Sequence, residues 1–146
     1  MSISIDAVGK QFAAVQYEAG REKIREFANA TGESSAVHQD AEAAKAAGFR
    51  DVVAPPMFCV VYSAPSIGPA FFDGEVAMDF ANMLHGAQEF EWGAPVCSGD
   101  LISTAASVKD ISVKGGMGFY VFETVSTNQD GAQTAKGTWT QIVRKG

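Results

Sequence analysis

The feature that most constrains this fold is the stretch from Val52 to Phe72, which contains no charged residue and is bounded by Asp51 and Asp73. Its length approaches the roughly 20 apolar residues that a membrane-spanning helix needs. Pro65 and Pro69 argue against such a span, because each would interrupt a continuous helix. The stretch therefore predicts a short helix buried inside the protein.

This helix is expected from about Pro56 to Ser63. Pro55 and Pro56 suit a first helical turn, where a missing N–H is harmless. A helix whose apolar side chains point in every direction is stable only when protein surrounds it on most sides. That is the pattern of Met57, Phe58, Val60, Val61 and Ala64. A sheet curled around the helix would bury them.

Composition excludes several functions. A chain of 146 residues, 47% hydrophobic, predicts one domain over residues 1–146 with a substantial core. The net charge of -6, without a basic run, argues against a nucleic-acid partner. The first ten residues lack a secretory signal and no other apolar run could span a bilayer, so a cytoplasmic protein is expected. Cys59 and Cys97 lack the spacing of a zinc site or disulfide framework, so no metal is expected.

The first part of the chain predicts a strand and two helices. Gln11–Tyr17 alternates as a strand does, and Arg21–Ala30 places its apolar residues on one helical face. Gly32 is expected to end that helix, and Asp40 to cap a second one that runs to Ala47. The polar segment Glu33–Gln39 lies between the helices.

The second part predicts four successive antiparallel strands. Gly115-Gly116 and the segment Asn128–Gly131 supply the turns of two hairpins. Large apolar groups occupy both faces of the third strand, which favours a dimer because a single helix can cover only one face. The expected strands are Met83–Trp92, Leu101–Val113, Met117–Thr127 and Ala132–Val143. An antiparallel sheet wrapped around one apolar helix is an α+β domain of hot-dog architecture.

Glu33 and His38 are the candidate catalytic residues. A carboxylate and an imidazole together can hold a water molecule and remove its proton near neutral pH. Because both residues lie in one loop between two short helices, we expect them to approach each other at the mouth of a pocket. A polar loop with one glutamate and one histidine is also common without any catalytic role.

Two runs carry a family resemblance. The segment Gly32–His38, followed by the alanine-rich Ala43–Phe49, resembles the G-D-x-N-P-x-H motif, helix and Gly-Phe of the MaoC-like hydratases and dehydratases. The downstream run Leu84–Trp92 is similar to the N-terminal type of MaoC dehydratase domain, as are Pro95, Gly99-Asp100 and Asn128–Gly131. The resemblance covers roughly residues 15–144.

The resemblance implies an activity without a cofactor. MaoC-like enzymes interconvert (R)-3-hydroxyacyl and trans-2-enoyl thioesters of coenzyme A or acyl carrier protein, in fatty acid metabolism, by adding or removing water. The N-terminal type includes the non-catalytic halves of mycobacterial heterodimeric hydroxyacyl-carrier-protein dehydratases. The implied partner is therefore a second MaoC-like subunit, either a copy of this chain or a homologue.

The chain also departs from the family motif. Glu33 replaces the family's aspartate, and Ser35-Ala36 replaces its Asn-Pro. At the start of the buried helix, catalytic members carry His-Gly, and the glycine N–H helps to polarise the thioester carbonyl. Pro55 and Pro56 occupy those positions here, and proline has no N–H to donate.

Six residues are implied to contact the substrate: Pro56, Met57, Phe58, Tyr62, His85 and Gly86. For each there is a structural alternative. The aromatic residues could be core rather than the wall of an acyl tunnel. His85 could be a hydrogen-bonded residue at a strand end or subunit edge.

Three functions remain open from the sequence. The chain could be a hydro-lyase subunit that uses Glu33 and His38, or a non-catalytic acyl-binding subunit whose partner carries the intact motif. The retained His38 favours the first, and Pro55-Pro56 favours the second. A hot-dog thioesterase, with Glu33 activating water, is the third.

Overall fold

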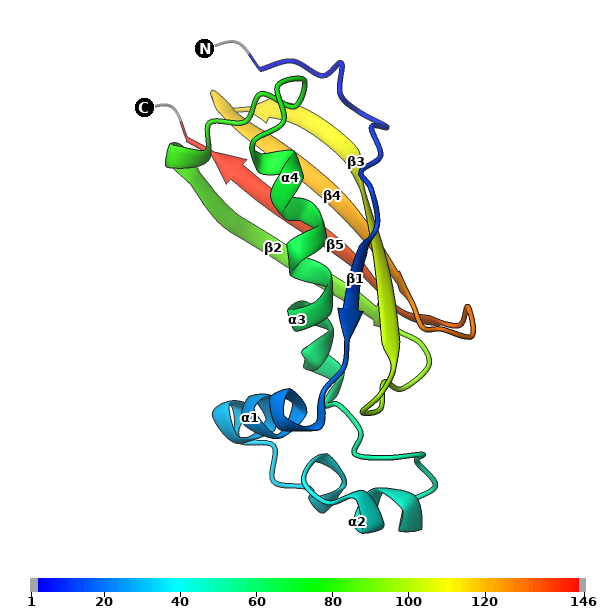
Figure 1. The fold of residues 1–146 in the computed structure, drawn as a ribbon. Helices are drawn as coiled ribbons and strands as arrows, with labels where there is room; N and C mark the ends of the chain where they lie inside the picture. The colour runs from blue at the N-terminus through cyan, green and yellow to red at the C-terminus, as the bar shows by residue number, and fades with distance from the viewer. Residues whose placement is uncertain (1–2, 145–146) are drawn as a thin grey trace.

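The computed structural model describes residues 3–144 and confirms the hot-dog fold. Five antiparallel strands form one sheet in the order β1-β3-β4-β5-β2, curled around a helical segment (Figure 1). The strands are β1 (Val15–Glu18), β2 (Met83–Trp92), β3 (Leu101–Lys114), β4 (Met117–Thr127) and β5 (Gln133–Val143).

The helical segment is longer than the sequence predicted. The predicted end of the helix at Ser63 is confirmed, because an α-helix stops there, but two further short helices extend the segment to Phe71. Pro65 and Pro69 each lie at the first or second position of one of these new helices, where the missing N–H is not needed. The segment, which we call the central helix, comprises η2 (Pro56–Phe58), α3 (Cys59–Ser63), η3 (Ala64–Ile67) and α4 (Gly68–Phe71). Among residues 3–144, no helix has the length and apolar character that crossing a bilayer requires.

Residues 21–50 form an overhang beyond the end of the sheet, next to the start of the central helix (Figure 1). It contains α1 (Arg21–Thr31), η1 (Ala36–His38) and α2 (Ala41–Ala46). Gly32 adopts a left-handed φ of 75° after α1, and the Asp40 carboxylate accepts the N–H groups of Glu42 and Ala43. Both predicted helix ends are confirmed.

The order of the strands in the sheet differs from that of a simple meander. β2 pairs with β5 rather than with β3, because residues 93–100 carry the chain across to the other side of the sheet. β1 is shorter than predicted, and Gln11 contributes only an isolated bridge to Ser107. A short helix, η4 (Phe80–Asn82), precedes β2. Within the described chain, β1 and β2 are therefore the two edges of the sheet.

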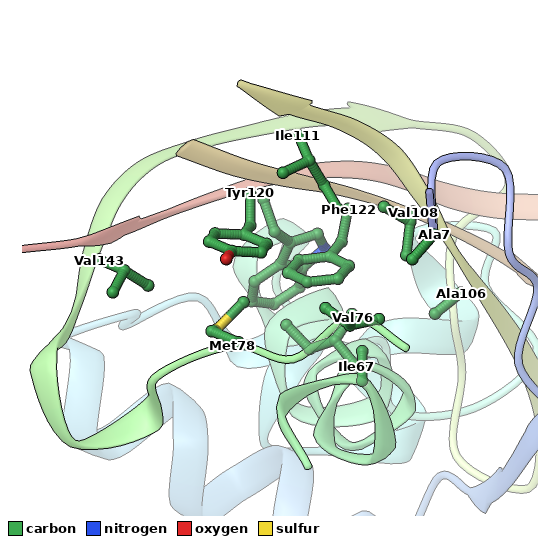
Figure 2. Close-up of a cluster of buried hydrophobic side chains, with 12 residues drawn as sticks. Ala7, Ile67, Val76, Met78, Ala106, Val108, Ile111, Tyr120, Phe122 and Val143 are labelled. Atoms are coloured by element: carbon green, nitrogen blue, oxygen red, sulfur yellow. The ribbon is translucent and has the colours of Figure 1, made fainter. Parts of the chain in front are cut away.

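The core lies between the sheet and the central helix. On β4, Tyr120 and Phe122 are fully buried and lie against Ile67 and Val76 (Figure 2). A second cluster surrounds Phe58 near the overhang. Burying one such aromatic or aliphatic side chain contributes about 1.5–3 kcal/mol. Both cysteines, Cys59 and Cys97, are buried free thiols.

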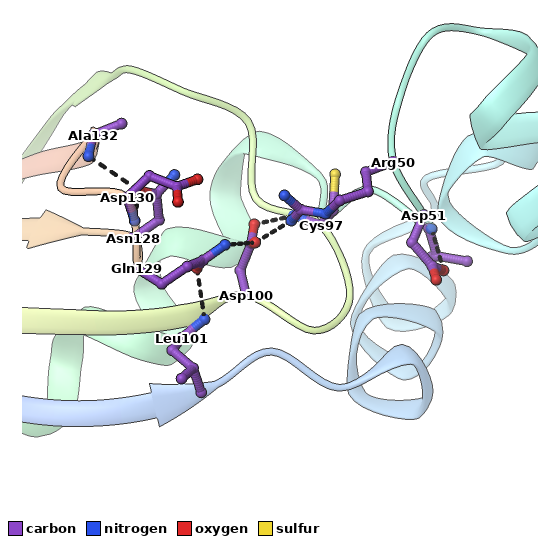
Figure 3. Close-up of polar contacts among 10 residues, drawn as sticks. Arg50, Asp51, Cys97, Asp100, Leu101, Asn128, Gln129, Asp130 and Ala132 are labelled. Carbon is purple, nitrogen blue, oxygen red and sulfur yellow. Dashed lines mark hydrogen bonds and ion pairs between the residues drawn. The ribbon is translucent and has the colours of Figure 1, made fainter.

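Asp100 connects the overhang to the sheet (Figure 3). Its buried carboxylate accepts the Cys97 N–H at 2.8 Å and the Gln129 side-chain amide at 2.8 Å, and it pairs with Arg50. Gln129 in turn accepts the Leu101 N–H at 3.0 Å. One carboxylate thus fixes the loop before β3, the β4–β5 turn and the end of the overhang.

Candidate functional site

A cavity of about 150 Å³ lies beside the start of the central helix. Its outer part contains the exposed Pro56, Trp92 and Pro95, and its inner part contains the buried Phe58 and Tyr62. Among the described residues, none that lines it carries a charge. The full lining is Ala54, Pro55, Pro56, Phe58, Cys59, Tyr62, Trp92, Gly93, Ala94, Pro95, Val96 and Thr134. The site therefore suits an uncharged, apolar group.

The mouth is shaped by the end of β2. Trp92 is 56% exposed, and its indole N–H donates to the carbonyl of Pro56 at 2.9 Å. Gly93 donates its N–H to the carbonyl of Thr134 at 2.9 Å. A Cβ at Gly93 would lie 2.1 Å from the carbonyl oxygen of Gln133, so only glycine permits this close approach. The position of the mouth is thus fixed by one side-chain bond and by the close approach of residues 93 and 133.

The inner end is closed by Tyr62. Its hydroxyl donates to Thr134 Oγ1 at 3.2 Å, and Thr134 donates to the carbonyl of Ser126 at 3.3 Å. Burial raises the pKa of Tyr62 to about 12, so the phenol is neutral at physiological pH. Burial also raises the pKa of the Cys59 thiol, which makes Cys59 a weak nucleophile. Neither the Tyr62 phenol nor the Cys59 thiol is therefore ionised at neutral pH.

His38 is buried and bonds to the segment that leads into the cavity lining. It is 8% exposed, and its Nδ1 lies 2.7 Å from the carbonyl oxygen of Val53, next to the cavity-lining Ala54. A carbonyl can only accept, so Nδ1 carries the proton, and in the neutral ring Nε2 keeps its lone pair. Val53 also donates its N–H to the carbonyl of Val37 at 3.0 Å. These two bonds hold the His38 loop against Val53, in the segment that precedes the central helix.

Glu33 lies on the exposed side of the same loop. Its backbone N–H donates to the carbonyl of Ala28 at 2.9 Å, as part of the cap that ends α1. In the described structure, its carboxylate and the His38 ring make no hydrogen bond or ion pair with each other, and neither residue lines the cavity. Their joint catalytic role stays a prediction.

His85 and Gly86 lie toward the opposite end of β2 from the cavity. The His85 Nδ1 is 3.0 Å from the side-chain nitrogen of Gln141, and its ring packs edge-on against Trp139 at 6.2 Å. Gly86 lies where the β2–β5 register shifts. These contacts match the structural alternative for His85, and the substrate-binding role of both residues stays a prediction.

The cavity thus brings together three of the six residues predicted to bind substrate: Pro56, Phe58 and Tyr62. Met57 is 47% exposed and lies outside the lining. Sequence reasoning missed Trp92 and Thr134, because they are distant from the helix in sequence and reach it only through the β2–β5 pairing. The turn sequence Trp92-Gly-Ala-Pro95 was the only local signal. Across the described residues, no group of three or more His, Cys, Asp or Glu side chains could hold a metal ion.

A family model for the FAS1-like dehydratase domain region matches residues 6–136. The chain belongs to this family. A UPF0336 protein from Saccharopolyspora erythraea is 38% identical over 141 residues, covering 94% of this chain and 90% of the relative. The cavity therefore belongs to a FAS1-like dehydratase domain.

Solved structures support the same family. The truncated HadBC (3R-hydroxyacyl-ACP dehydratase) complex from Mycobacterium tuberculosis superposes with a TM-score of 0.81 at 25% identity, covering 94% of this chain and 97% of that chain. A MaoC-like dehydratase superposes with a TM-score of 0.86 at 25% identity, covering 96% of this chain and 43% of that longer chain. The resemblance to MaoC-like dehydratases is confirmed.

Proposed function

We propose that this chain is the acyl-binding subunit of a dimeric hydro-lyase that interconverts (R)-3-hydroxyacyl and trans-2-enoyl thioesters of coenzyme A or acyl carrier protein. The observation that carries the proposal is an uncharged cavity at the start of a helix that has Pro55 as its N-cap and Pro56 as its first residue. The cavity can hold an acyl group, whereas the prolines cannot donate to its carbonyl oxygen.

The acyl-binding role follows from the character of the lining. Phe58, Tyr62 and Trp92 present aromatic surface, and the Tyr62 and Thr134 hydroxyls bond to each other rather than to the cavity. Apolar surface removed from water contributes about 25 cal/mol per Å². An acyl chain therefore gains binding energy here without leaving a polar group unpaired.

The need for a partner follows from what the helix start lacks. Addition of water to an enoyl thioester builds negative charge on the carbonyl oxygen, and losing one preorganised donor typically costs about 10²–10³-fold in rate. A partner with His-Gly at the equivalent position would supply the donor. The HadBC neighbour is itself a complex of two named subunits.

The pairing surface in this proposal is the free edge of β2. Among residues 3–144 this strand pairs only with β5, so its other edge leaves N–H and C=O groups available for a strand from a partner. The half-buried outer face of β4, which carries Phe119 and Val121, is consistent with further cover by a second subunit.

A second candidate is that the chain is catalytic by itself. The observation in its favour is the His38 ring, whose Nδ1 is fixed by the Val53 carbonyl so that Nε2 can accept a proton. This candidate requires the Glu33 side chain to turn toward the ring and another N–H, such as that of Met57, to replace the missing donor.

The test is hydration of crotonyl-coenzyme A by the purified chain, alone and coexpressed with a MaoC-like protein that carries the intact Asp/His and His-Gly motifs. We expect little or no turnover from the single chain and full turnover from the mixed dimer. Turnover of roughly 1–10³ s⁻¹ by the single chain would overturn the acyl-binding role.

The variant His38→Ala separates the two candidates when it is measured in both preparations. If the partner carries the chemistry, the rate of the mixed dimer should change by less than about threefold, with Glu33→Gln as the matched variant in the same loop. If the chain is catalytic by itself with His38 as the general base, the turnover of the single chain should fall by about 10²–10⁴-fold. Light scattering on both preparations would confirm that the dimer is retained.

A further inference from the structure

We infer that Tyr62 sets the length of the acyl group that the cavity accepts, and that the substrate class is a short-chain thioester of about four to six acyl carbons. The inference rests on the proposed function, because it takes the cavity to be the acyl site. It adds a residue that limits the length of the acyl group, and it sets an upper limit on the number of acyl carbons.

The size of the cavity gives the bound. An apolar cavity of about 150 Å³ can hold a molecule the size of benzene, which has about six carbon atoms. The cavity beside the central helix has this volume. A hexanoyl group therefore fills it, and a longer chain needs space that the structure does not offer there.

Tyr62 is the residue that closes the inner end. It is 3% exposed, and its ring lies 6.2 Å from the Phe58 ring and 6.5 Å from the Tyr17 ring. Its hydroxyl is held by Thr134, on β5, so the ring spans the space between the helix and the sheet. An acyl chain that enters at Trp92 meets this ring as a wall.

The backbone of Tyr62 is also held by hydrogen bonds. The backbone carbonyl of Tyr62 accepts from Thr104 Oγ1 at 3.4 Å, and Thr104 shares a 2.7 Å hydrogen bond with Ser126. Moving the ring aside would break the Tyr62–Thr134 bond in a buried place, where an unpaired polar group is costly. The length limit is therefore a built property of the site.

The experiment measures binding rather than turnover, so it does not depend on which subunit is catalytic. Butanoyl, hexanoyl, octanoyl and dodecanoyl thioesters of pantetheine, the arm that coenzyme A and carrier proteins share, are titrated calorimetrically into the full chain in its dimer. Each buried methylene should strengthen binding about fourfold. Affinity should rise about 15-fold from butanoyl to hexanoyl and then stop rising or fall.

Tyr62→Ala should move the optimum to octanoyl or longer, because the lost ring opens space toward the core. Tyr62→Leu, which keeps more apolar packing, should give a smaller shift and serves if the alanine variant does not fold. Tyr62→Phe keeps the ring and should keep the wild-type optimum. An unchanged optimum in both truncated variants overturns the inference.

Ala94→Leu separates this outcome from a failure of the proposed function. Ala94 lines the cavity and is half-buried, so a larger side chain there should weaken binding of every thioester. If Ala94→Leu weakens binding while Tyr62 truncation leaves the optimum unchanged, only the length limit is wrong. If no thioester binds, or if neither position affects affinity, the cavity is not the acyl site and both proposals fall.

Discussion

The overhang and the start of the central helix differ in how closely each matches the motif of the MaoC-like family. The overhang keeps His38, held by the Val53 carbonyl at 2.7 Å, on a surface-exposed loop. At the helix start Pro55 is buried and Pro56 is exposed, and neither residue has an N–H to donate. The two regions meet in a pair of hydrogen bonds at Val53, so their relative placement does not depend on the donors that are missing.

This difference shows that position and chemistry are specified by different groups. Backbone bonds such as Val53 N–H to the Val37 carbonyl fix where the loop lies. The capacity to polarise a thioester depends on N–H groups at the helix start, which proline lacks. Under the proposed function, this chain therefore supplies the cavity while the partner supplies the donor that polarises the thioester.

The largest effect is expected from truncating one of two aromatic rings that pack against each other where the overhang meets the central helix. Phe58 of the helix is fully buried, while Phe27 of the overhang is half-buried and packs edge-on against it at 5.5 Å. Phe58→Ala should lower the free energy of unfolding by about 3–5 kcal/mol. Phe27→Ala should cost clearly less in the same urea titration. Equal costs would mean that the overhang is as much part of the core as the helix.

The sequence predicted the fold well because its signals were local. Strand β2 and strand β4 have the predicted bounds, and Gly32 and Asp40 cap the helices as expected. The place of β2 beside β5 was not predictable, because it depends on the crossover of residues 93–100 rather than on any strand pattern. The end of the helix at Ser63 was predicted, but the short helices that follow to Phe71 were not, because Pro65 and Pro69 were treated only as breaks and not also as early positions of new helices.

The site was only partly predictable. Residues on the central helix, such as Phe58 and Tyr62, were found because the uncharged stretch identified them. Trp92 and Thr134 come from strands that reach the cavity only in three dimensions. The orientation of Glu33 relative to His38 depends on side-chain torsions in a loop, for which spacing along the chain carries no information.

The second prediction concerns Asp100, which joins the overhang to the sheet rather than to the central helix. Asp100→Ala should cost about 2–3 kcal/mol, because hydrogen bonds to a buried charged group contribute more than neutral ones. Arg50→Ala is the matched control and should cost less than about 1 kcal/mol, since the Arg50 side chain is 57% exposed. A larger loss for Arg50→Ala than for Asp100→Ala in chemical denaturation would contradict this assignment.

A smaller effect is expected within the overhang itself. Asp40→Ala removes the cap that accepts the N–H groups of Glu42 and Ala43, which should cost about 1 kcal/mol. Because α2 lies outside the main core, amide exchange should accelerate in residues 41–46 while the central helix stays protected. Asp40→Asn, which can also cap, should restore most of the protection. Uniform acceleration throughout the chain would show that the two regions unfold as one unit.

The smallest effect concerns Asp51, which lies where the overhang leads into the uncharged stretch. The N–H of Val52 at 2.6 Å and the Arg21 guanidinium at 2.9 Å hold the pKa of the Asp51 carboxyl below its ordinary value. A carboxylate whose pKa is lowered by folding stabilises the protein above its unfolded pKa of about 3.9. That contribution is lost as the pH falls through the folded pKa.

Asp51→Asn should therefore lower the free energy of unfolding by less than about 1 kcal/mol at pH 7, because Arg21 is 45% exposed and solvent screens the pair. The difference between wild type and variant should stay constant from pH 7 to about pH 5 and shrink below about pH 4. Urea titrations from pH 7 to pH 2.5 measure it, with Glu26→Gln as the surface control that breaks only the exposed pair with Lys23. A difference that persists unchanged to the lowest pH would show that Asp51 acts through side-chain shape rather than charge, and the boundary between the two regions would then owe nothing to this ion pair.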